Sequence, residues 1–238
     1  MNRGPIIAID GPAGAGKSTV ARHLAQHFGL LNLETGAMYR AFALKAILSD
    51  QDFDDSAALE RLARDSTITL EPTRAGNRVY LDARDVTERI RDSDVTQGAS
   101  RISVHPAIRT WMVDLQRDLG QRGGVVMEGR DIGTVVFPDA DIKVFLDASP
   151  EARSQRRYEQ NSASGSTQAQ KFDHAEVSKE LRERDERDRN RADSPLRPAR
   201  DAIVIDSTEL SLDQVLARIE ELVLPLCPRI QPANEPGR

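Results

Sequence analysis

The sequence predicts an α/β protein in which helices flank a parallel sheet, and two observations support that fold class. Short apolar runs bounded by glycine or proline recur along the chain, as expected for strands buried on both faces of a parallel sheet. Segments with the apolar spacing of helices lie between and after these runs. The 238 residues are 39% hydrophobic but only 4% aromatic, so the core must be built mainly from aliphatic side chains.

The expected elements follow in chain order. The apolar run at 5–10 is the first strand, and it leads through a glycine-rich loop into a helix over 17–28, in which Val20, Leu24 and Phe28 share one face. A later helix begins at Ser149-Pro150, with serine at the cap and proline in the first turn. Another begins at Ser211, where a glutamine three positions on completes a capping box. Further buried strands are expected at 125–127, 142–146 and 203–205.

Residues 50–96 do not fit the alternation of strands and helices. Polar and apolar residues alternate at 67–70 and again at 78–81, with Gly76-Asn77 between them, which is typical of a hairpin with one wet face. We therefore interpret 50–96 as a small insertion outside the parallel sheet. The polar stretch 161–170 is either a mobile flap or an ordinary solvated loop. The proline-rich end of the chain, 229–238, is expected to be disordered.

Charge and composition exclude several classes of protein. The net charge is -5, from 33 basic and 38 acidic residues, which argues against a nucleic-acid partner. The chain has no apolar run of the roughly 18 residues that a membrane-spanning helix needs, and its first residues do not resemble a signal peptide. The single cysteine, Cys227, cannot form an internal disulfide, which fits a reducing compartment. We expect a cytoplasmic protein without a membrane partner.

The glycine-rich loop after the first strand carries the clearest chemical signal. Residues 11–18 match the pattern G-x-x-x-x-G-K-[ST] in the required context, after a predicted strand and at the start of a predicted helix. Glycines let backbone amides approach phosphate oxygens, the lysine reaches the β- and γ-phosphates, and the serine hydroxyl ligates Mg²⁺. The alternative, a glycine turn followed by a chance Lys-Ser, explains less. The expected ATP-binding residues are Gly11, Pro12, Ala13, Gly14, Ala15, Gly16, Lys17, Ser18 and Thr19.

Arginines gather near the predicted ends of strands and on two helix faces. Glu128-Gly129-Arg130-Asp131 follows the strand at 125–127, at the edge where open α/β sheets bind ligands, although alone it could be a charged turn. Arg184, Asp188 and Arg191 are spaced to share one helix face, while most charges around them are those of a solvated helix. Arg153, Arg156 and Arg157 likewise share a face. Phosphoryl transfer needs such guanidinium groups, because it depends on alignment and charge neutralisation.

Four blocks of sequence together resemble the bacterial cytidylate kinases. They are 11–18, Thr35-Gly36-Ala37-Met38-Tyr39-Arg40, 129–140 and 184–191, in the same order and spacing as in that family, and the resemblance covers roughly residues 5–225. It implies a single P-loop kinase domain over 1–228, with a nucleoside-monophosphate-binding insertion at 50–96 and a lid at 158–174. It also implies a monomer that phosphorylates CMP and dCMP with ATP and Mg²⁺.

The resemblance also implies residue roles. Thr35, Arg40 and Arg130 would hold the acceptor phosphate, and Ser100, Arg109 and Asp131 would read the cytosine ring. Arg184 and Asp188 would contact the ribose, with Arg191 near the phosphates. The catalytic set would be Lys17, Arg130, Arg157 and Arg191, with Arg156 and Arg157 as lid arginines. Ser18 would ligate the metal, and Glu128 is the acidic residue nearest to a supporting position.

Two other readings remain open at this point. One is a P-loop kinase for a different small acceptor, such as UMP or a metabolite that is not a nucleotide. The other is a regulatory or nucleic-acid-associated module that binds a nucleoside triphosphate without transferring phosphate. The absence of an N-K-x-D sequence argues against a guanine-specific switch, and the arginines exceed what a regulator needs.

Overall fold

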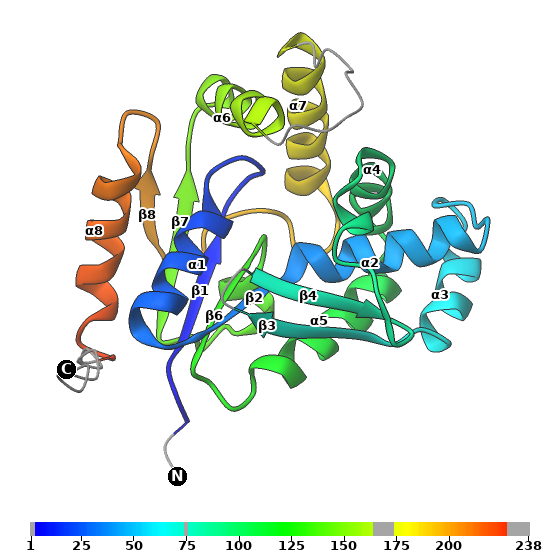
Figure 1. Ribbon diagram of the computed structural model, residues 1–238, viewed down its shortest axis with the longest axis horizontal. Coiled ribbons are helices and arrows are strands. Elements are labelled where there is room, and N and C mark those ends of the chain that lie inside the picture. The colour runs from blue at the N-terminus through cyan, green and yellow to red at the C-terminus, as the bar shows by residue number, and fades with distance from the viewer. Residues whose placement is uncertain (1–2, 74–75, 164–173, 228–238) are drawn as a thin grey trace, which may run out of the picture.

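A five-stranded parallel sheet forms the centre of the protein (Figure 1). The computed structural model describes residues 3–73, 76–163 and 174–227. The strand order is β2-β6-β1-β7-β8, so the first strand lies in the middle. The strands are β1 (Ile6–Asp10), β2 (Leu31–Glu34), β6 (Val125–Gly129), β7 (Ile142–Asp147) and β8 (Ile203–Asp206). The predicted fold class is therefore confirmed.

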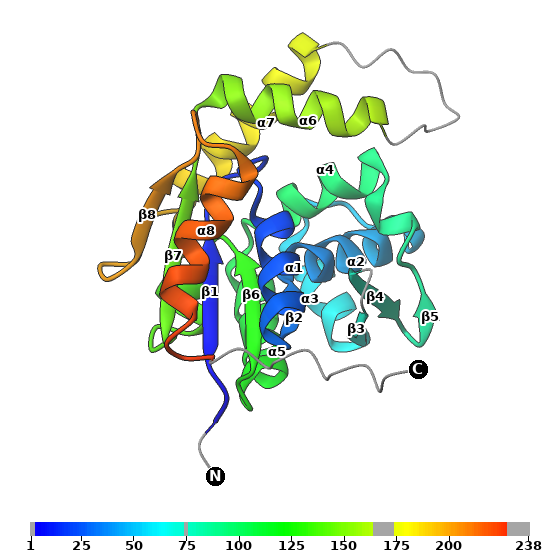
Figure 2. The same ribbon diagram turned by 60° about the vertical axis from the view of Figure 1, so that its left-hand side comes forward.

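Helices cover both faces of this sheet (Figures 1 and 2). Ile7 and Ile9 of β1 pack in a cluster with apolar residues of α1 (Lys17–Phe28) and α8 (Leu212–Val223). Ile6 and Ala8 point to the opposite face, because successive side chains of a strand alternate. On that face they join residues of α2 (Thr35–Leu48), α4 (Ser93–Ile102) and α5 (Pro106–Gly120). Burial on both faces explains why β1 is apolar at four of its five positions.

The predicted hairpin is confirmed as part of a second, antiparallel sheet, with order β3-β4-β5. Its strands are β3 (Ile68–Thr73), β4 (Gly76–Leu81) and β5 (Arg84–Asp85). The expectation that Gly76-Asn77 lies between the strands is wrong. Gly76 pairs with Thr73 and Asn77 with Pro72, because the register set by the buried positions continues the ladder to these residues. The intervening 74–75 lie outside the described residues.

The antiparallel sheet shares its core with the rest of the protein. Leu59 of α3 (Ser56–Arg64), Leu70 of β3 and Val79 of β4 belong to the same buried cluster as Leu33 and Met127 of the parallel sheet. A short 3₁₀ turn, η1 (Arg89–Arg91), follows β5. The segment that the sequence sets apart as an insertion is therefore outside the parallel sheet but not outside the hydrophobic core.

Two strands differ from the sequence-based expectation. β2 is not predicted, because its four residues, Leu-Asn-Leu-Glu, lie at the sheet edge and do not form an apolar run. β8 is predicted as buried, and this is wrong. It is the opposite edge strand, and Val204 at 57% and Ile203 at 43% are exposed. The strands expected at 5–10, 125–127 and 142–146 are confirmed.

Two helices lie beyond the carboxyl ends of β1 and β7, as Figure 1 shows. They are α6 (Pro150–Ala163) and α7 (His174–Asn190). The Ser149 hydroxyl accepts a hydrogen bond from the Ala152 amide at the start of α6, and the predicted capping box of Ser211 and Gln214 begins α8. Of the expected flap at 161–170, residues 161–163 continue α6, and 164–170 lie outside the described residues, as does the tail 229–238.

No helix in the described part of the chain combines the length and the apolar character that crossing a bilayer requires.

Candidate active site

The loop 11–16 joins the central strand β1 to α1 at the carboxyl edge of the sheet. Gly11 has φ 148°, and a Cβ added there would lie 2.0 Å from the Leu146 carbonyl oxygen of the adjacent strand β7, so only glycine fits. Lys17 is the first residue of α1, and its Nζ donates to the Pro12 carbonyl at 2.6 Å. The loop therefore curls around the lysine that the sequence assigns to phosphate binding.

Lys17 is buried among charges, only 6% exposed. Burial lowers the pKa of its ammonium to about 7, and the positive charge of Arg130 acts in the same direction, while Glu128 opposes it. An anionic ligand would stabilise the charged form of this lysine, because it would supply negative charge that the surrounding side chains do not provide in full. Both the charge environment of Lys17 and the backbone conformation of the loop therefore favour an anionic ligand.

Asp10, the last residue of β1, holds the neighbouring segment in place. Its carboxylate accepts hydrogen bonds from the amides of Ile132 at 2.8 Å and Gly133 at 2.7 Å, at the start of the π-helical turn η2 (Ile132–Val136). Burial raises the pKa of Asp10 to about 6, although the two amides counteract it. Asp10 fixes the position of Asp131, the residue just before η2, relative to the phosphate loop.

Arg153 of α6 ties the phosphate loop to α7. Its guanidinium donates to the Ala148 carbonyl at 2.9 Å and to the Ala13 carbonyl of the loop at 3.0 Å, and it forms an ion pair with Asp185 at 2.6 Å. The residue is only 1% exposed. Its planar fork therefore links three separate parts of the chain.

Glu128 on β6 presents a buried carboxylate beside the start of α1. The Ser18 hydroxyl interacts with it, and burial, followed by the charge of Glu34, raises the pKa of the Glu128 carboxyl. One of its oxygens, Oε1, is buried and has no hydrogen-bond partner among the described residues. A hydroxyl and a carboxylate are the hard oxygen donors that Mg²⁺ prefers, so the donor set fits that ion.

Four arginines come together near Lys17, and we call them the guanidinium cluster. Burial lowers the pKa of Arg184 to about 10, with further lowering by the like charges of its three neighbours. Asp188 is the acidic residue that opposes this effect, and it also accepts a hydrogen bond from Arg130 Nε at 2.7 Å. The members of the cluster are Arg40, Arg130, Arg157 and Arg184. Positive charge exceeds negative charge here, which favours an anion.

A second group of predicted site residues surrounds Asp131. Arg109 of α5 pairs with its carboxylate through a buried hydrogen bond, and Arg191 lies 4.0 Å from its other oxygen. Arg191 is also 4.0 Å from Asp188, so this group adjoins the guanidinium cluster. Tyr39 of α2 lies nearby, and burial raises the pKa of its phenol to about 12.

Several predicted residues have other partners. The Thr35 hydroxyl donates to the Glu128 backbone carbonyl at 2.7 Å, and Arg40 pairs with Glu34. Ser100 accepts from Arg187 Nε at 3.1 Å, so it faces α7 in this structure. Thr19 is exposed, and its amide bonds to the Gly16 carbonyl within the loop.

The three arginines of α6 contact three different parts of the chain. Arg156 donates to the Ser207 hydroxyl at 3.0 Å and to its carbonyl at 2.6 Å, so it anchors α6 to the loop after β8. Arg153 faces the phosphate loop, and only Arg157 joins the guanidinium cluster. All three lie within α6, at a spacing that places them on one side of the helix, but helical spacing alone does not say which neighbours each long side chain meets.

Sequence reasoning missed Asp10, Tyr39, Asp185 and Arg187. The position of Asp10 before the glycine loop was visible, since a carboxylate at the end of a buried strand is unusual. Asp185 and Arg187 sit in a run of alternating charges, where nothing local distinguishes a buried partner from a solvated one.

A parallel sheet whose central strand runs into such a loop is the core of a P-loop nucleotide-binding protein, and the guanidinium cluster near Lys17 fits a kinase. Residues 7–224 match the family described as cytidylate kinase. The cytidylate kinase of Pelotomaculum thermopropionicum is 50% identical over 220 residues, which cover 92% of this chain and 96% of that protein. The cytidylate kinase of Solibacter usitatus is 47% identical over 219 residues, 92% of this chain and 90% of that protein.

The chain belongs to the cytidylate kinase family, as its four sequence blocks predict. It is accordingly an enzyme of the phosphotransferase class.

Proposed function

We propose that the protein transfers the γ-phosphoryl group of ATP to the phosphate of CMP, and also of dCMP. The observation that carries this proposal is the guanidinium cluster next to Lys17. The phosphate loop accounts for one nucleotide, and the cluster offers positive charge for a second phosphorylated molecule. A protein that only bound a triphosphate would have no use for this second set.

The donor side rests on the loop 11–18. Its backbone amides and the amino end of α1 would bind the phosphates of ATP, with Lys17 next to the transferring group. Ser18 and Glu128 would hold Mg²⁺, directly or through water. When bound, the ion neutralises charge on the phosphate oxygens. The low pKa of Lys17 means that ATP binding restores its full charge, where the reaction develops negative charge.

The acceptor side rests on the arginines. Arg130 and Arg40 would hold the phosphate of CMP, and Arg157 and Arg191 would approach the transferring group. An oxygen of the CMP phosphate attacks the γ-phosphorus in line, the new O–P bond forms, and the bond to the β–γ bridging oxygen breaks, releasing ADP. Guanidinium groups suit this step because their forks hold two oxygens at once.

Base recognition would fall to Asp131 and Arg109. The exocyclic amine of cytosine donates a hydrogen bond that the Asp131 carboxylate can accept, and Arg109 can donate to N3 or O2. Their buried pairing, without nucleotide, keeps both side chains in place before the base arrives. Ser100 would have to exchange Arg187 for the base. Arg184 and Asp188 would contact the ribose.

We further propose that 50–96 forms the acceptor-binding side and 158–174 the lid, and that the protein acts as a monomer. The contribution of α6 and α7, beyond the carboxyl ends of the strands, would be to exclude water, which competes as an acceptor. Disrupting such a lid should raise ATP hydrolysis in the absence of CMP.

A coupled assay of ADP formation with ATP, Mg²⁺ and a panel of CMP, dCMP, UMP and AMP tests the proposal. CMP and dCMP are expected to be the best acceptors, and faster turnover of UMP would refute the assignment. Lys17→Ala should nearly abolish turnover. Lys45→Ala is the matched control, because this lysine of α2 pairs with Asp82 away from the phosphate loop and should retain turnover.

A further inference from the structure

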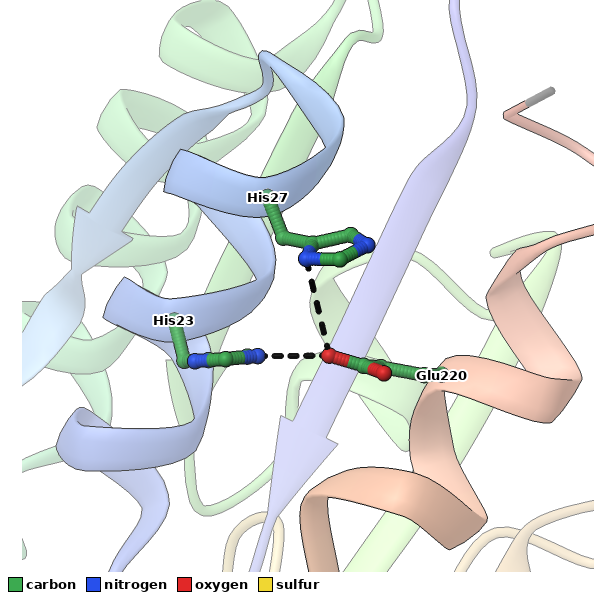
Figure 3. A group of neighbouring side chains, drawn as sticks. All are labelled: His23, His27 and Glu220. Carbon is green, nitrogen blue, oxygen red and sulfur yellow. Dashed lines mark hydrogen bonds and ion pairs between the residues drawn. The ribbon is translucent and has the colours of Figure 1, made fainter. Parts of the chain in front are cut away.

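Two histidines of α1 and a glutamate of α8 point toward one another (Figure 3). His23 and His27 are four residues apart, so they project from the same face of α1. His23 Nε2 lies 2.6 Å from Glu220 Oε1, and His27 Nδ1 lies 3.7 Å from the same oxygen. The two imidazole rings are stacked at 5.7 Å between centroids.

The donor atoms match a first-row metal in type and spacing. Two imidazole nitrogens and one carboxylate oxygen lie within 4.8 Å of one another. In a tetrahedral site, metal–ligand bonds of about 2.0–2.2 Å separate neighbouring ligand atoms by roughly 3.3–3.6 Å. The distances of 2.6 and 3.7 Å lie on either side of this value, so rotations of the side chains suffice to reach it.

We propose that His23, His27 and Glu220 form a Zn²⁺ site that joins α1 to α8. Imidazole and carboxylate ligands suit zinc. The side chains are 38%, 31% and 27% exposed, so the ion can enter from solvent and water can serve as the fourth ligand. The site is separate from the one that Ser18 and Glu128 offer to Mg²⁺, because it is made of other residues, and its nitrogen ligands favour zinc over Mg²⁺.

The ion would act on the packing of the two helices. α1 and α8 share the cluster on one face of the sheet, to which Leu24 and Phe28 of α1 and Val215 and Ile219 of α8 all belong. Since α1 begins at Lys17, a bond between its second half and α8 restrains the helix that carries the catalytic lysine. Zinc bound only to the folded protein raises the unfolding temperature by mass action.

The test is calorimetric titration of ZnCl₂ into the full-length, nucleotide-free protein without an affinity tag. One equivalent is expected to bind. His27→Ala and Glu220→Gln should each weaken binding by roughly tenfold or more, since losing a ligand costs at least as much as losing an outer-shell partner. Both changes are at partly exposed positions, so the variants should fold, which circular dichroism checks.

His174→Ala is the matched control, because this exposed histidine of α7 contacts Tyr158 and lies outside the cluster. It should bind zinc like the wild type, and the added ion should raise the unfolding temperature of both but not of His27→Ala. No binding by the wild type, or equal affinity in the wild type, His27→Ala and Glu220→Gln, would overturn the proposal. Equal affinity would place the ion elsewhere, for example at Glu128.

Discussion

Arg153 offers the sharpest test of how the phosphate loop is held. Arg153→Met keeps the apolar length of the side chain but removes the guanidinium that joins Ala13, Ala148 and Asp185. Asp185 then keeps a carboxylate that is only 13% exposed and has lost its ion-pair partner. Breaking a buried pair from one side typically costs about 3–5 kcal/mol. For a chain of this size, that corresponds to a fall of roughly 6–20 °C in unfolding temperature.

A double-mutant cycle separates the ion pair from the other contacts. Asp185→Leu alone should also cost about 3–5 kcal/mol, because it leaves Arg153 charged and buried. If the pair is the main contribution, the double variant loses it only once, and its total should fall short of the sum by about 2–3 kcal/mol. Urea unfolding of the four proteins, followed by circular dichroism, measures these free energies.

Activity gives an independent readout of the same contact. Because the Ala13 carbonyl belongs to the loop 11–18, Arg153→Met should raise the KM for ATP more than the KM for CMP. Arg153→Lys is the conservative control, since it keeps a charge near Asp185 but cannot reach both carbonyls. Strictly additive free energies, or an Arg153→Met protein as stable as the wild type, would show that this contact does not hold the loop.

Three further changes test the site. Asp131→Asn should raise the KM for CMP roughly 5- to 150-fold, the equivalent of about 1–3 kcal/mol for an unmatched buried group, with little change for ATP; equal effects on both substrates would make Asp131 structural. ATP binding at pH 8 should take up close to one proton, because Lys17, with a pKa near 7, is mostly neutral before binding and charged afterwards; titrations in two buffers of different ionisation enthalpy measure this uptake, and Lys17→Met should abolish it. Glu128→Gln should increase the Mg²⁺ concentration needed for half-maximal turnover, and an unchanged Mg²⁺ dependence would exclude Glu128 from the metal site.

The parts of the fold that the sequence predicts are those with strong local signals. Each of these signals depends on neighbouring residues, and the structure confirms three of them: the loop between the first strand and the first helix, the strands at 125–127 and 142–146, and the capping box at Ser211. β2 is missed because four residues at a sheet edge carry no distinctive period. The exposure of β8 is missed because an apolar run does not reveal whether a helix will cover it.

The sequence indicates which residues belong to the candidate site better than it indicates how they are arranged. The family resemblance names Arg109, Asp131 and Arg191, and the structure brings these three together. A sequence motif does not show which arginine holds parts of the chain together and which is available to a ligand. Arg153 and Arg157 are four residues apart on one helix, yet one is fully buried against the phosphate loop and the other joins the guanidinium cluster. That difference depends on how α6 packs, which only the folded chain determines.

The shared cluster of buried residues has a mechanical consequence for the segment 50–96. Leu59, Leu70 and Val79 lie in the same interior as Leu33 of the parallel sheet, so the segment has no separate interior around which it could turn as a rigid piece. Any large rotation would open apolar surface to water on both sides of the break, and its cost would grow with the exposed area. Adjustment to an incoming nucleotide should therefore take the form of small sliding shifts along α2, rather than a wide hinge opening.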